Sequence, residues 1–251
     1  MEVQTEAQVV GERPADRGDA DLAALGSVLA DRARMRMLLA LGDGRTLPAS
    51  VLAAEAGVAP STASSHLARL ADAGLLQATV RGRYRYYGLA GPAVGELIET
   101  LARLCPTAPV RSLREGTRAH AVRRARSCYD HLAGRLGVDL TAALVAGGLL
   151  TIAEQADLDA AQALAARPGL LTPTGRTRLT ALGLALPDLD VVRCCTDWTE
   201  QRPHLAGPHG RALLRWLFDQ NWLHRAPRGR AVRVTEDGRR GLRAEFGLDP
   251  E

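Results

Sequence analysis

Cysteine and histidine lie close together at two places in the second half of the chain. The first stretch contains Cys128 and His131, and the second contains Cys194, Cys195 and His204. Thiolate and imidazole groups bind soft metal ions or metalloids, and thiols with a lowered pKa take part in redox reactions. Free cysteine is commonly a small buried core residue, and core packing is the favoured role for Cys128. The residue types therefore allow a metal or redox site, the lining of a ligand pocket, or plain core packing.

Aromatic and basic side chains surround the second stretch. All three tryptophans fall within the 25 residues from Trp198 to Trp222, and Arg202 lies beside His204. Apolar walls with a few polar groups are typical of ligand pockets. We therefore expect a small-molecule effector to be sensed in this half, with a metal or metalloid ion as the alternative. The pattern requires no cofactor and specifies no metal.

The adjacent cysteines carry two further expectations. Arg193 and Arg202 flank Cys194 and Cys195, and a nearby guanidinium would lower a thiol pKa. Adjacent cysteines do not readily bridge each other, so we expect one to be buried and the other to point outward.

The two stretches begin similar segments, which indicates an internal duplication near residues 128–179 and 195–242. Each has a cysteine, then His-Leu-Ala-Gly, then leucines at matching distances, and finally Thr-x-x-Gly-Arg. Residues 110–137 are predicted to form one long helix, on which Cys128 and His131 would be about one turn apart. Its inner face would consist of Leu113, Ala121, Ala125, Cys128, Leu132 and Leu136.

Residues 58–89 combine a predicted helix with a basic hairpin. The hairpin turns at Arg81-Gly82-Arg83 and is rich in tyrosine, which favours strands. Short polar side chains on a helix suit base edges in the major groove, and arginines on a hairpin suit the flanking phosphates. Leu67 and Leu70 would point inward on this helix. The side chains left outside are Ser61, Thr62, Ser64, Ser65 and Arg69.

The elements upstream complete a winged helix-turn-helix. Residues 19–44 carry the apolar stripes of a long or bent helix pair that ends at Gly42 and Gly44. A short helix over 47–57 and a turn follow, and we expect Ser61 to cap the recognition helix. After the hairpin, residues 91–105 form a further helix with one apolar stripe, for which a dimer interface is the favoured use. That stripe consists of Val94, Leu97, Ile98, Leu101 and Leu104.

Residues 20–105, about a third of the chain, resemble the ArsR/SmtB family of bacterial repressors. The motifs are LGSVLADRARMRMLLAL, then ASVLAAEAGVAPSTASSHLARLADAGLLQATVRGRYRYYGL. The resemblance implies a homodimer that binds an inverted repeat in double-stranded DNA and leaves it when an effector binds. By position it implies a DNA face made of Ser61, Thr62, Ser64, Ser65, His66, Arg69, Arg81, Arg83 and Arg85. His66 is ambiguous, because a histidine before a core leucine often packs or caps.

Metal-sensing members of that family carry ligands at two other places. These are a Cys-x-Cys pair on the helix before recognition, or Asp, His and Glu along the dimer helix. Here the two places read LAAEAG and VGELIETLARLC, and Cys105 is alone at the end of the second. A metal site at the positions usual for the family is therefore not expected.

The C-terminal segment 221–235 aligns with 74–88 and keeps the Arg-Gly-Arg turn. The helix before it, over 208–219, is apolar where a recognition helix is polar, so it should pack rather than contact bases. Phosphate contacts by Arg228, Arg230 and Arg233 are a less favoured option. The predicted fold is mainly α with small β-hairpin wings (α+β). It has a disordered tail (1–18), a winged helix-turn-helix (19–107) and a duplicated, degenerate winged-helix-like C-terminal domain (108–251).

The charge pattern agrees with DNA binding. All 32 basic residues are arginine, against 28 acids, and the stretch 73–95 holds three arginines and no acid. A local positive patch on a weakly charged protein suits specific DNA binding. No apolar run is long enough to cross a membrane and no leader is evident, which predicts a cytoplasmic protein.

Enzyme motifs are missing from the sequence: it has no phosphate-cradling glycine loop, metal-hydrolase signature or nucleophile elbow. We therefore expect a transcriptional repressor and not an enzyme. The alternatives are an architectural DNA-binding protein without an effector, or a repressor that responds to thiol oxidation or a metal(loid) through Cys128 and Cys195.

Overall fold

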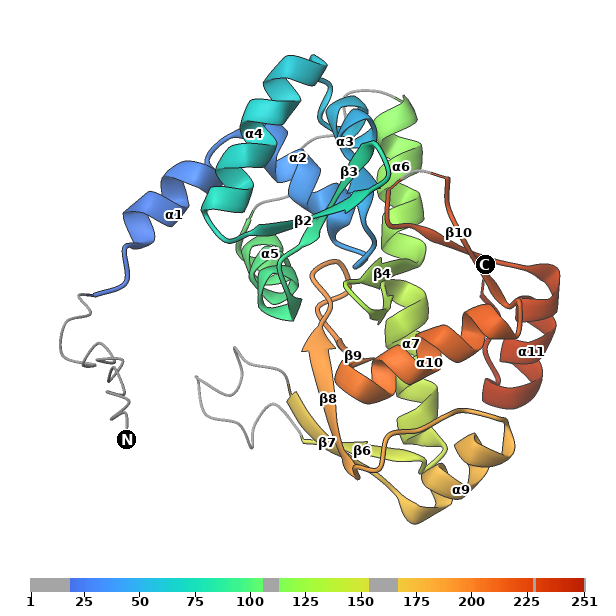
Figure 1. The fold of residues 1–251 in the computed structure, drawn as a ribbon. Helices are drawn as coiled ribbons and strands as arrows, with labels where there is room; N and C mark the ends of the chain where they lie inside the picture. Colours follow the sequence, from blue (N-terminus) through green and yellow to red (C-terminus); the bar gives the residue numbers. More distant parts are fainter. Residues whose placement is uncertain (1–18, 106–112, 154–166, 228, 251) are drawn as a thin grey trace, which may run out of the picture.

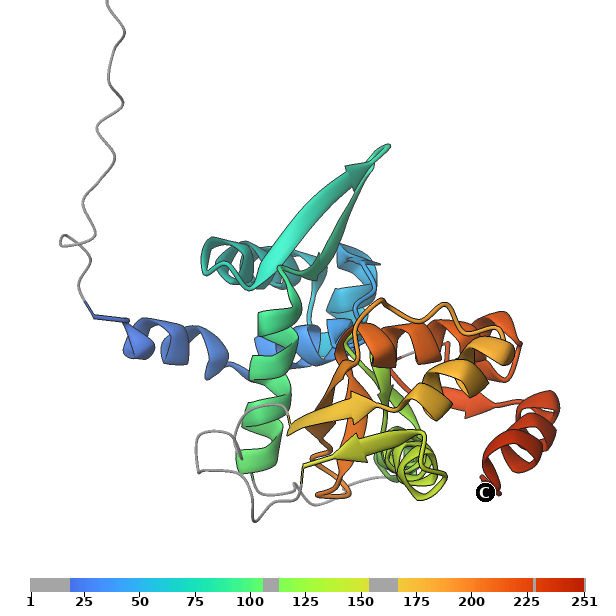
Figure 2. The same ribbon diagram turned by 90° about the horizontal axis from the view of Figure 1, so that it is seen from below.

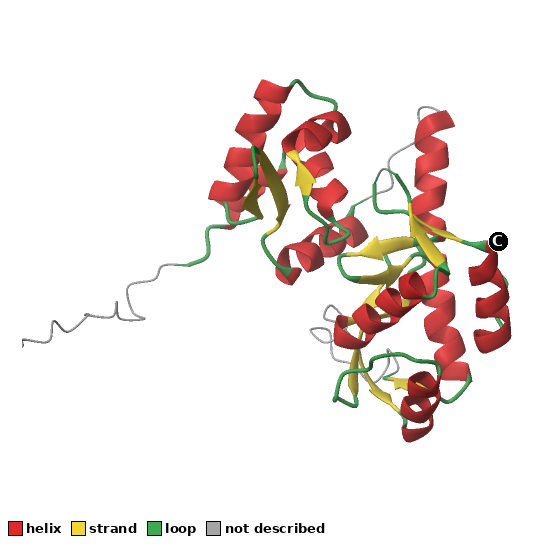
Figure 3. Cartoon of the chain, turned by 45° about the vertical axis from the view of Figure 1, so that its right-hand side comes forward, coloured by secondary structure: helices red, strands yellow, loops and turns green. Residues whose placement is uncertain are grey.

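The computed structural model describes residues 19–105, 113–153, 167–227 and 229–250. In Figure 1 the chain forms an N-terminal group of helices with a protruding hairpin and a C-terminal group of short strands and helices packed against it. The colouring of Figure 3 shows that both groups mix helices with short strands. Within these residues no helix is both long and apolar enough to span a membrane.

The N-terminal half is a winged helix-turn-helix. Asp21 and Asp31 accept hydrogen bonds at the starts of the first two helices, so residues 19–44 form a helix pair with a break between them. Pro60, and not Ser61, begins the recognition helix, and no side chain caps it. The elements are α1 (Leu22–Leu29), α2 (Arg32–Leu41), β1 (Leu47–Pro48), α3 (Ala49–Ala56), α4 (Pro60–Asp72), β2 (Leu76–Arg81), β3 (Tyr84–Leu89) and α5 (Pro92–Leu104).

The wing and the core of this half fix where α4 lies. Strands β1, β3 and β2 form an antiparallel sheet in that order, and the β2–β3 hairpin extends away from the body of the molecule (Figure 2). Leu67 and Leu70 on α4 are fully buried, together with Leu38, Leu41 and Leu52. Each such leucine contributes about 1.5–3 kcal/mol through burial. One side of α4 is thereby held in the core and the other faces outward.

The C-terminal half repeats one order of elements twice after α6. Among the described residues, which leave out 154–166, two strands, a helix, two strands and a helix occur from β4 to α9 and again from β8 to α11. The elements are α6 (Leu113–Arg124), β4 (Arg126–Cys128), β5 (His131–Ala133), α7 (Arg135–Ala146), β6 (Leu150–Ile152), β7 (Arg167–Leu171), α9 (Pro173–Ala181), β8 (Val191–Thr196), β9 (Pro203–Ala206), α10 (Gly207–Asp219), β10 (Leu223–Arg225), β11 (Val232–Val234) and α11 (Glu236–Phe246).

Close contacts at equivalent glycines support the duplication. A Cβ atom on Gly137 would lie 2.6 Å from the carbonyl oxygen of Leu132, and one on Gly210 would lie 2.4 Å from that of Leu205. The two repeats also interlock, because α7 of the first packs on β9 of the second and α10 of the second packs on β5 of the first. Their side chains form one core cluster. The repeats therefore fold as one unit around shared contacts.

The prediction of one long helix over 110–137 is wrong. Residues 113–124 are helical, but the chain then forms the β4–β5 hairpin and begins a new helix at Arg135. Tyr129 has φ 55° and Gly134 has φ 77°, values that an α-helix does not accommodate. Leu113, expected on the inner face, is 93% exposed. Residues 110–112 lie outside the described residues, as does the predicted disordered tail.

The apolar C-terminal helix packs as predicted. Leu213, Leu214, Trp216 and Leu217 on α10 are all buried. The option of a phosphate contact by Arg230 is wrong, because Arg230 is only 6% exposed and pairs with Glu99 on α5. Arg228 lies outside the described residues, and Arg233 is exposed.

Candidate DNA interface and buried cysteine–histidine cluster

The outward face of α4 is polar. Ser61, Thr62, Ser64, Ser65 and Arg69 are exposed there. The hydroxyl groups of Ser64 and Ser65 donate to backbone carbonyls one turn earlier, at 3.0 and 3.4 Å. Their oxygen lone pairs stay free to accept hydrogen bonds, so this face can present both donors and acceptors to base edges.

His66 is placed differently from the other residues predicted on this helix. It is half-buried, and its Nδ1 lies 3.3 Å from Nη1 of Arg34 and 3.9 Å from a carboxylate oxygen of Asp31. It therefore packs against the start of α2 instead of lying on the exposed face. This placement fits the packing alternative stated for His66.

The wing is an exposed basic hairpin. Gly82 at its tip has φ 60°, a conformation that glycine adopts without strain. Arg81, Arg83 and Arg85 are exposed. The guanidinium of Arg81 lies 5.5 Å from the ring of Tyr86 and that of Arg83 lies 5.2 Å from the ring of Tyr84. These cation–π contacts orient the arginines while leaving their N–H groups in solvent.

The apolar stripe of α5 is divided between two environments. Ile98 is 2% exposed and belongs to the core of its own domain, so the prediction that it lies in a dimer interface is wrong. Val94 and Leu97 are partly buried against the same core. Leu101 is half-buried and Leu104 is 74% exposed. The face around Ile98 is used within the chain because β3 and Tyr129 cover it.

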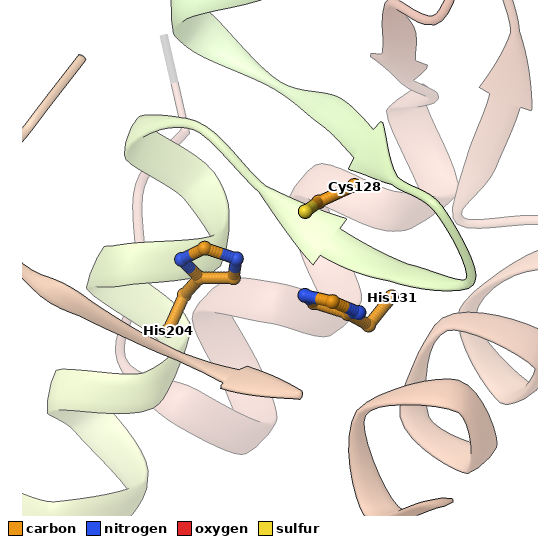
Figure 4. Close-up of side chains that lie close together, drawn as sticks. All are labelled: Cys128, His131 and His204. Carbon is orange, nitrogen blue, oxygen red and sulfur yellow. The ribbon is translucent and has the colours of Figure 1, made fainter. Parts of the chain in front are cut away.

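Cys128, His131 and His204 come together in the interior of the C-terminal half. Their donor atoms all lie within 4.8 Å of one another, and all three residues are buried. They converge from β4, β5 and β9 (Figure 4). Cys128 is directly opposite His131 in one hairpin, and Cys195 is directly opposite His204 in the other. The predicted proximity of Cys128 and His131 is thus correct, but it arises from strand pairing and not from a helical turn.

Three of the four ring nitrogens of His131 and His204 have no hydrogen-bond partner among the described residues. Their rings stack with centroids 5.1 Å apart. Nδ1 of His131 contacts Oδ1 of Asp130 at 3.1 Å, and Asp130 in turn pairs with Arg211 at 2.7 Å. Among the described residues, Nε2 of His131 and both ring nitrogens of His204 have no hydrogen-bond partner. Buried polar atoms without a partner cost about 1–3 kcal/mol each, so they call for an explanation.

Burial and neighbouring groups both determine the protonation of this cluster. It lowers the pKa of His204 to about 3, which keeps that imidazole neutral. Burial opposes the protonation of His131, but Cys128 and the hydrogen bond with Asp130 raise its pKa. Burial also raises the pKa of the Cys128 thiol. Cys195 is directly opposite His204 in the β8–β9 pair, so the two side chains lie on the same face of the sheet. Among the described residues, the donors within 4.8 Å of one another are those of Cys128, His131 and His204.

The predicted lowering of a thiol pKa by Arg193 and Arg202 is wrong for Cys194. Burial raises the pKa of Cys194 to about 12. Arg193 instead pairs with Glu96 at 3.2 Å, and Arg202 with Asp139 at 3.7 Å. The expectation that one cysteine is buried is confirmed by Cys194. The expectation that the other points outward is not met by Cys195, which is half-buried and lies opposite the buried His204.

The three tryptophans do not form one wall. Trp216 and Trp222 pack edge to face at 4.8 Å in the core, whereas Trp198 lies under the guanidinium of Arg126 at 5.0 Å. Arg202 lines a cleft of about 480 Å³, but neither Trp198 nor His204 does. A larger cleft of about 560 Å³ lies between α6, α7 and β11, and none of the predicted effector residues lines it.

A buried ion-pair network connects the cluster with α5, and no sequence pattern pointed to it directly. Arg126, fully buried, donates to Asp197 at 2.8 Å and lies 3.6 Å from Glu99. Arg230 also pairs with Glu99. Burial opposes ionisation of Asp197, but Arg126 and Thr199 outweigh it and hold its pKa at about 2.

Comparison with known proteins agrees with the fold. A family model described as a helix-turn-helix domain matches residues 29–77. The HTH-type transcriptional regulator YdfF of Bacillus subtilis (strain 168) is 37% identical over 224 residues, which are 87% of this chain and 94% of YdfF. The HTH-type transcriptional regulator CmtR of Mycobacterium tuberculosis (strain H37Rv) is 44% identical over 84 residues, 32% of this chain and 70% of CmtR.

Among solved structures, a winged helix-turn-helix domain is similar to about a third of the chain. The homodimeric winged helix-turn-helix DNA-binding domain Mb0332 of Mycobacterium bovis, described as a possible ArsR-family transcriptional regulator, is 27% identical. It covers 35% of this chain and 88% of its own, with a TM-score of 0.30. The similarity to YdfF, by contrast, runs through both halves. The chain therefore belongs to the HTH-type transcriptional regulators, and its N-terminal half is a winged helix-turn-helix.

Proposed function

We propose that this regulator is a sequence-specific repressor that places α4 in the major groove and the wing along the flanking backbone. The observation that carries the proposal is the chemistry of one surface. Exposed hydroxyls and Arg69 lie on one side of α4, and three exposed arginines follow on the wing with no acid between residues 73 and 95. Hydroxyls suit base edges, and the arginines suit phosphates.

Exposed apolar side chains support a homodimer. Within the described structure α1 has no buried residue although it is strongly apolar, and Leu22 is 74% exposed. Leu104 at the end of α5 is equally exposed. A second copy covering these helices would remove their apolar surface from water. It would also set two recognition helices about one DNA turn apart, on an inverted repeat.

The C-terminal half is the proposed sensor. It contacts the DNA-binding half through charged groups, because Arg225 pairs with the buried Asp43 and Arg230 pairs with Glu99. An effector that shifts this half would change those pairs and the position of α5. Release from DNA then follows if the effector binds the off-DNA arrangement more tightly.

The test is a fluorescence-anisotropy titration of the full chain on DNA from upstream of its own gene, over a series of salt concentrations. We expect a palindromic site bound by two chains, with tighter binding than scrambled DNA. Equal affinity for scrambled DNA, insensitive to every effector tried, would favour the architectural alternative. Absence of binding at low salt would overturn both.

A further inference from the structure

We infer that Cys128, His131 and His204, completed by Cys195, form a binding site for a soft or borderline transition-metal ion such as Zn²⁺. Metal binding itself does not depend on the proposed function. The further step, that this ion is the effector of the repressor, rests on it. The donor set points to the class of ligand, since imidazole and thiolate together select zinc, copper and related ions over hard cations such as Mg²⁺.

The geometry is close to that of a coordination site. The three donor atoms lie within 4.8 Å of one another. Donors around one tetrahedral zinc ion are about 3.5 Å apart, given bond lengths of about 2.0–2.3 Å. The three side chains would therefore move together by about an ångström or less. Any protons on Cys128 Sγ and His131 Nε2 would pass to solvent as the ion takes their place.

The surroundings of the histidines fit ligation better than core packing. Asp130 receives the Nδ1–H of His131 and is itself held by Arg211. A carboxylate behind a histidine in this manner is the usual support of a metal ligand, because it fixes the ring and leaves Nε2 facing the ion. Packing alone gives no reason for three buried ring nitrogens without partners on His131 and His204.

Charge balance favours Cys195 as the fourth donor. The adjacent network is already balanced, with Arg126 and Arg230 against Glu99 and Asp197. A divalent ion with one thiolate would leave a buried positive charge, whereas two thiolates neutralise it. Cys195 stands in the second hairpin as Cys128 does in the first. Because it is half-buried, it also marks the side from which an ion can enter.

The site is connected with the helix that follows the wing. Arg126 lies two residues before Cys128, and Asp197 lies two residues after Cys195. Arg126 binds Asp197 and lies against Glu99 of α5. Drawing the two hairpins together around an ion would therefore shift a fully buried guanidinium that contacts α5. Through this contact, binding of the ion would change the position of α5 in the DNA-binding half.

The first experiment measures metal binding without DNA. The full chain, reduced and stripped with a chelator, is titrated with Co²⁺ and then with Zn²⁺. We expect one Co²⁺ per chain, a thiolate-to-cobalt charge-transfer band and its loss on adding Zn²⁺. Cys128→Ser should weaken the band and Cys128→Ser with Cys195→Ser should abolish it, because no thiolate donor then remains. Cys105→Ser, which changes an exposed cysteine at the end of α5, should keep it.

A second variant guards against misfolding of the first. Asp130→Asn keeps all four donors and should weaken Zn²⁺ binding by about 10–100-fold, the range seen when such a supporting carboxylate is removed. Thermal unfolding checks that each variant is folded. A folded wild type without a charge-transfer band, or equal loss of the band in Cys105→Ser, would overturn the site.

The second experiment adds DNA. Zn²⁺ should weaken operator binding by at least about fivefold in the wild type, the lower end of ordinary allosteric coupling, and by less than about twofold in Cys128→Ser. If Co²⁺ binds stoichiometrically but the affinity for the operator does not change, the metal site stands and the role of the ion as effector is overturned. Failure of the metal-free protein to bind DNA would instead overturn the proposed function, so the two failures are distinguishable.

Discussion

Two helix–hairpin units of this chain share one plan and use it for opposite purposes. In the first, α4 precedes the β2–β3 wing, and in the second, α10 precedes the β10–β11 hairpin. The outward side of α4 is hydroxyl-rich and exposed, whereas α10 buries Leu214 and Trp216. Both hairpins turn at a glycine with positive φ, Gly82 and Gly229. The arrangement of helix and hairpin alone therefore does not determine whether a unit can bind DNA.

The arginines that follow these glycines show the difference most clearly. Arg83 is exposed and stacks beside Tyr84, while Arg230 is buried and paired with Glu99. The same residue at the same place in a turn is exposed to solvent in one unit, where we propose that it contacts phosphate, and forms an internal ion pair in the other. The role of each arginine depends on the partner that the fold places beside it. For Arg230 that partner is Glu99 on α5.

The largest expected effect concerns stability. Arg230→Ala removes one partner of a buried ion pair and should lower the free energy of unfolding by about 3–5 kcal/mol. Arg83→Ala, the matched change on the exposed wing, should alter it by less than about 0.5 kcal/mol. Urea denaturation measures both. Similar losses in the two variants would show that the two turns do not differ as described.

The next effect concerns DNA affinity. Arg81→Ala combined with Arg83→Ala should weaken binding at least about tenfold, since hydrogen bonds to charged groups contribute about 1.5–3 kcal/mol each. The slope of log affinity against log salt should fall by about 2, because each arginine is expected to neutralise one phosphate. Arg215→Ala, on the exposed side of α10, is the control and should change neither quantity. An unchanged slope in the double variant would exclude the wing from DNA binding.

A smaller effect concerns base preference. Ser64→Ala with Ser65→Ala should reduce the difference between operator and mismatched sites by about 1–3 kcal/mol, the usual contribution of a base contact. Affinity for random DNA should stay nearly constant, because these hydroxyls are not expected to neutralise phosphate. Competition with a library of single-base operator variants measures this. If binding to all DNA sequences weakens equally, α4 contacts the DNA backbone and not the bases.

The smallest effect is a difference in acid sensitivity. Burial opposes ionisation of Glu99, but Arg230 and Arg126 outweigh it and lower its pKa below the ordinary 4.5. The unfolded chain therefore takes up this proton first as the pH falls. Stability from Glu99 is present above about pH 4.5 and decreases as the pH falls through the folded pKa. Glu99→Gln should show a shallower loss of stability in the same range, and parallel curves would contradict this.

The N-terminal half could be predicted well from the sequence because its signals are local. Leucine spacing, Gly57 and the Arg-Gly-Arg turn each determine one element without help from distant residues. The prediction failed between residues 110 and 137, where a helix-favouring composition conceals a two-residue turn. That turn depends on Tyr129, whose backbone N–H donates to the carbonyl of Gly42 at 2.7 Å. A contact across such a sequence distance leaves no local pattern.

The candidate sites divide in the same way. The exposed side of α4 could be predicted from helical spacing, except that His66 turns toward Arg34. Cys128 and His131 could be named as a pair, but their meeting with His204 depends on how the two repeats interlock. The network around Arg126 and Glu99 could not be predicted, because its members come from positions far apart in the chain and each is a common surface residue type.

The interlocked repeats have a consequence for assembly. The first repeat supplies Cys128 and His131 to the cluster and the second supplies His204, so neither repeat encodes the cluster alone. Had the repeats been separate chains, the cluster would form only on their encounter and would vanish on dilution. Joining them in one polypeptide replaces that encounter by a fixed, high effective concentration. The cluster is thus available in every molecule, at any expression level, with a stoichiometry of one per chain.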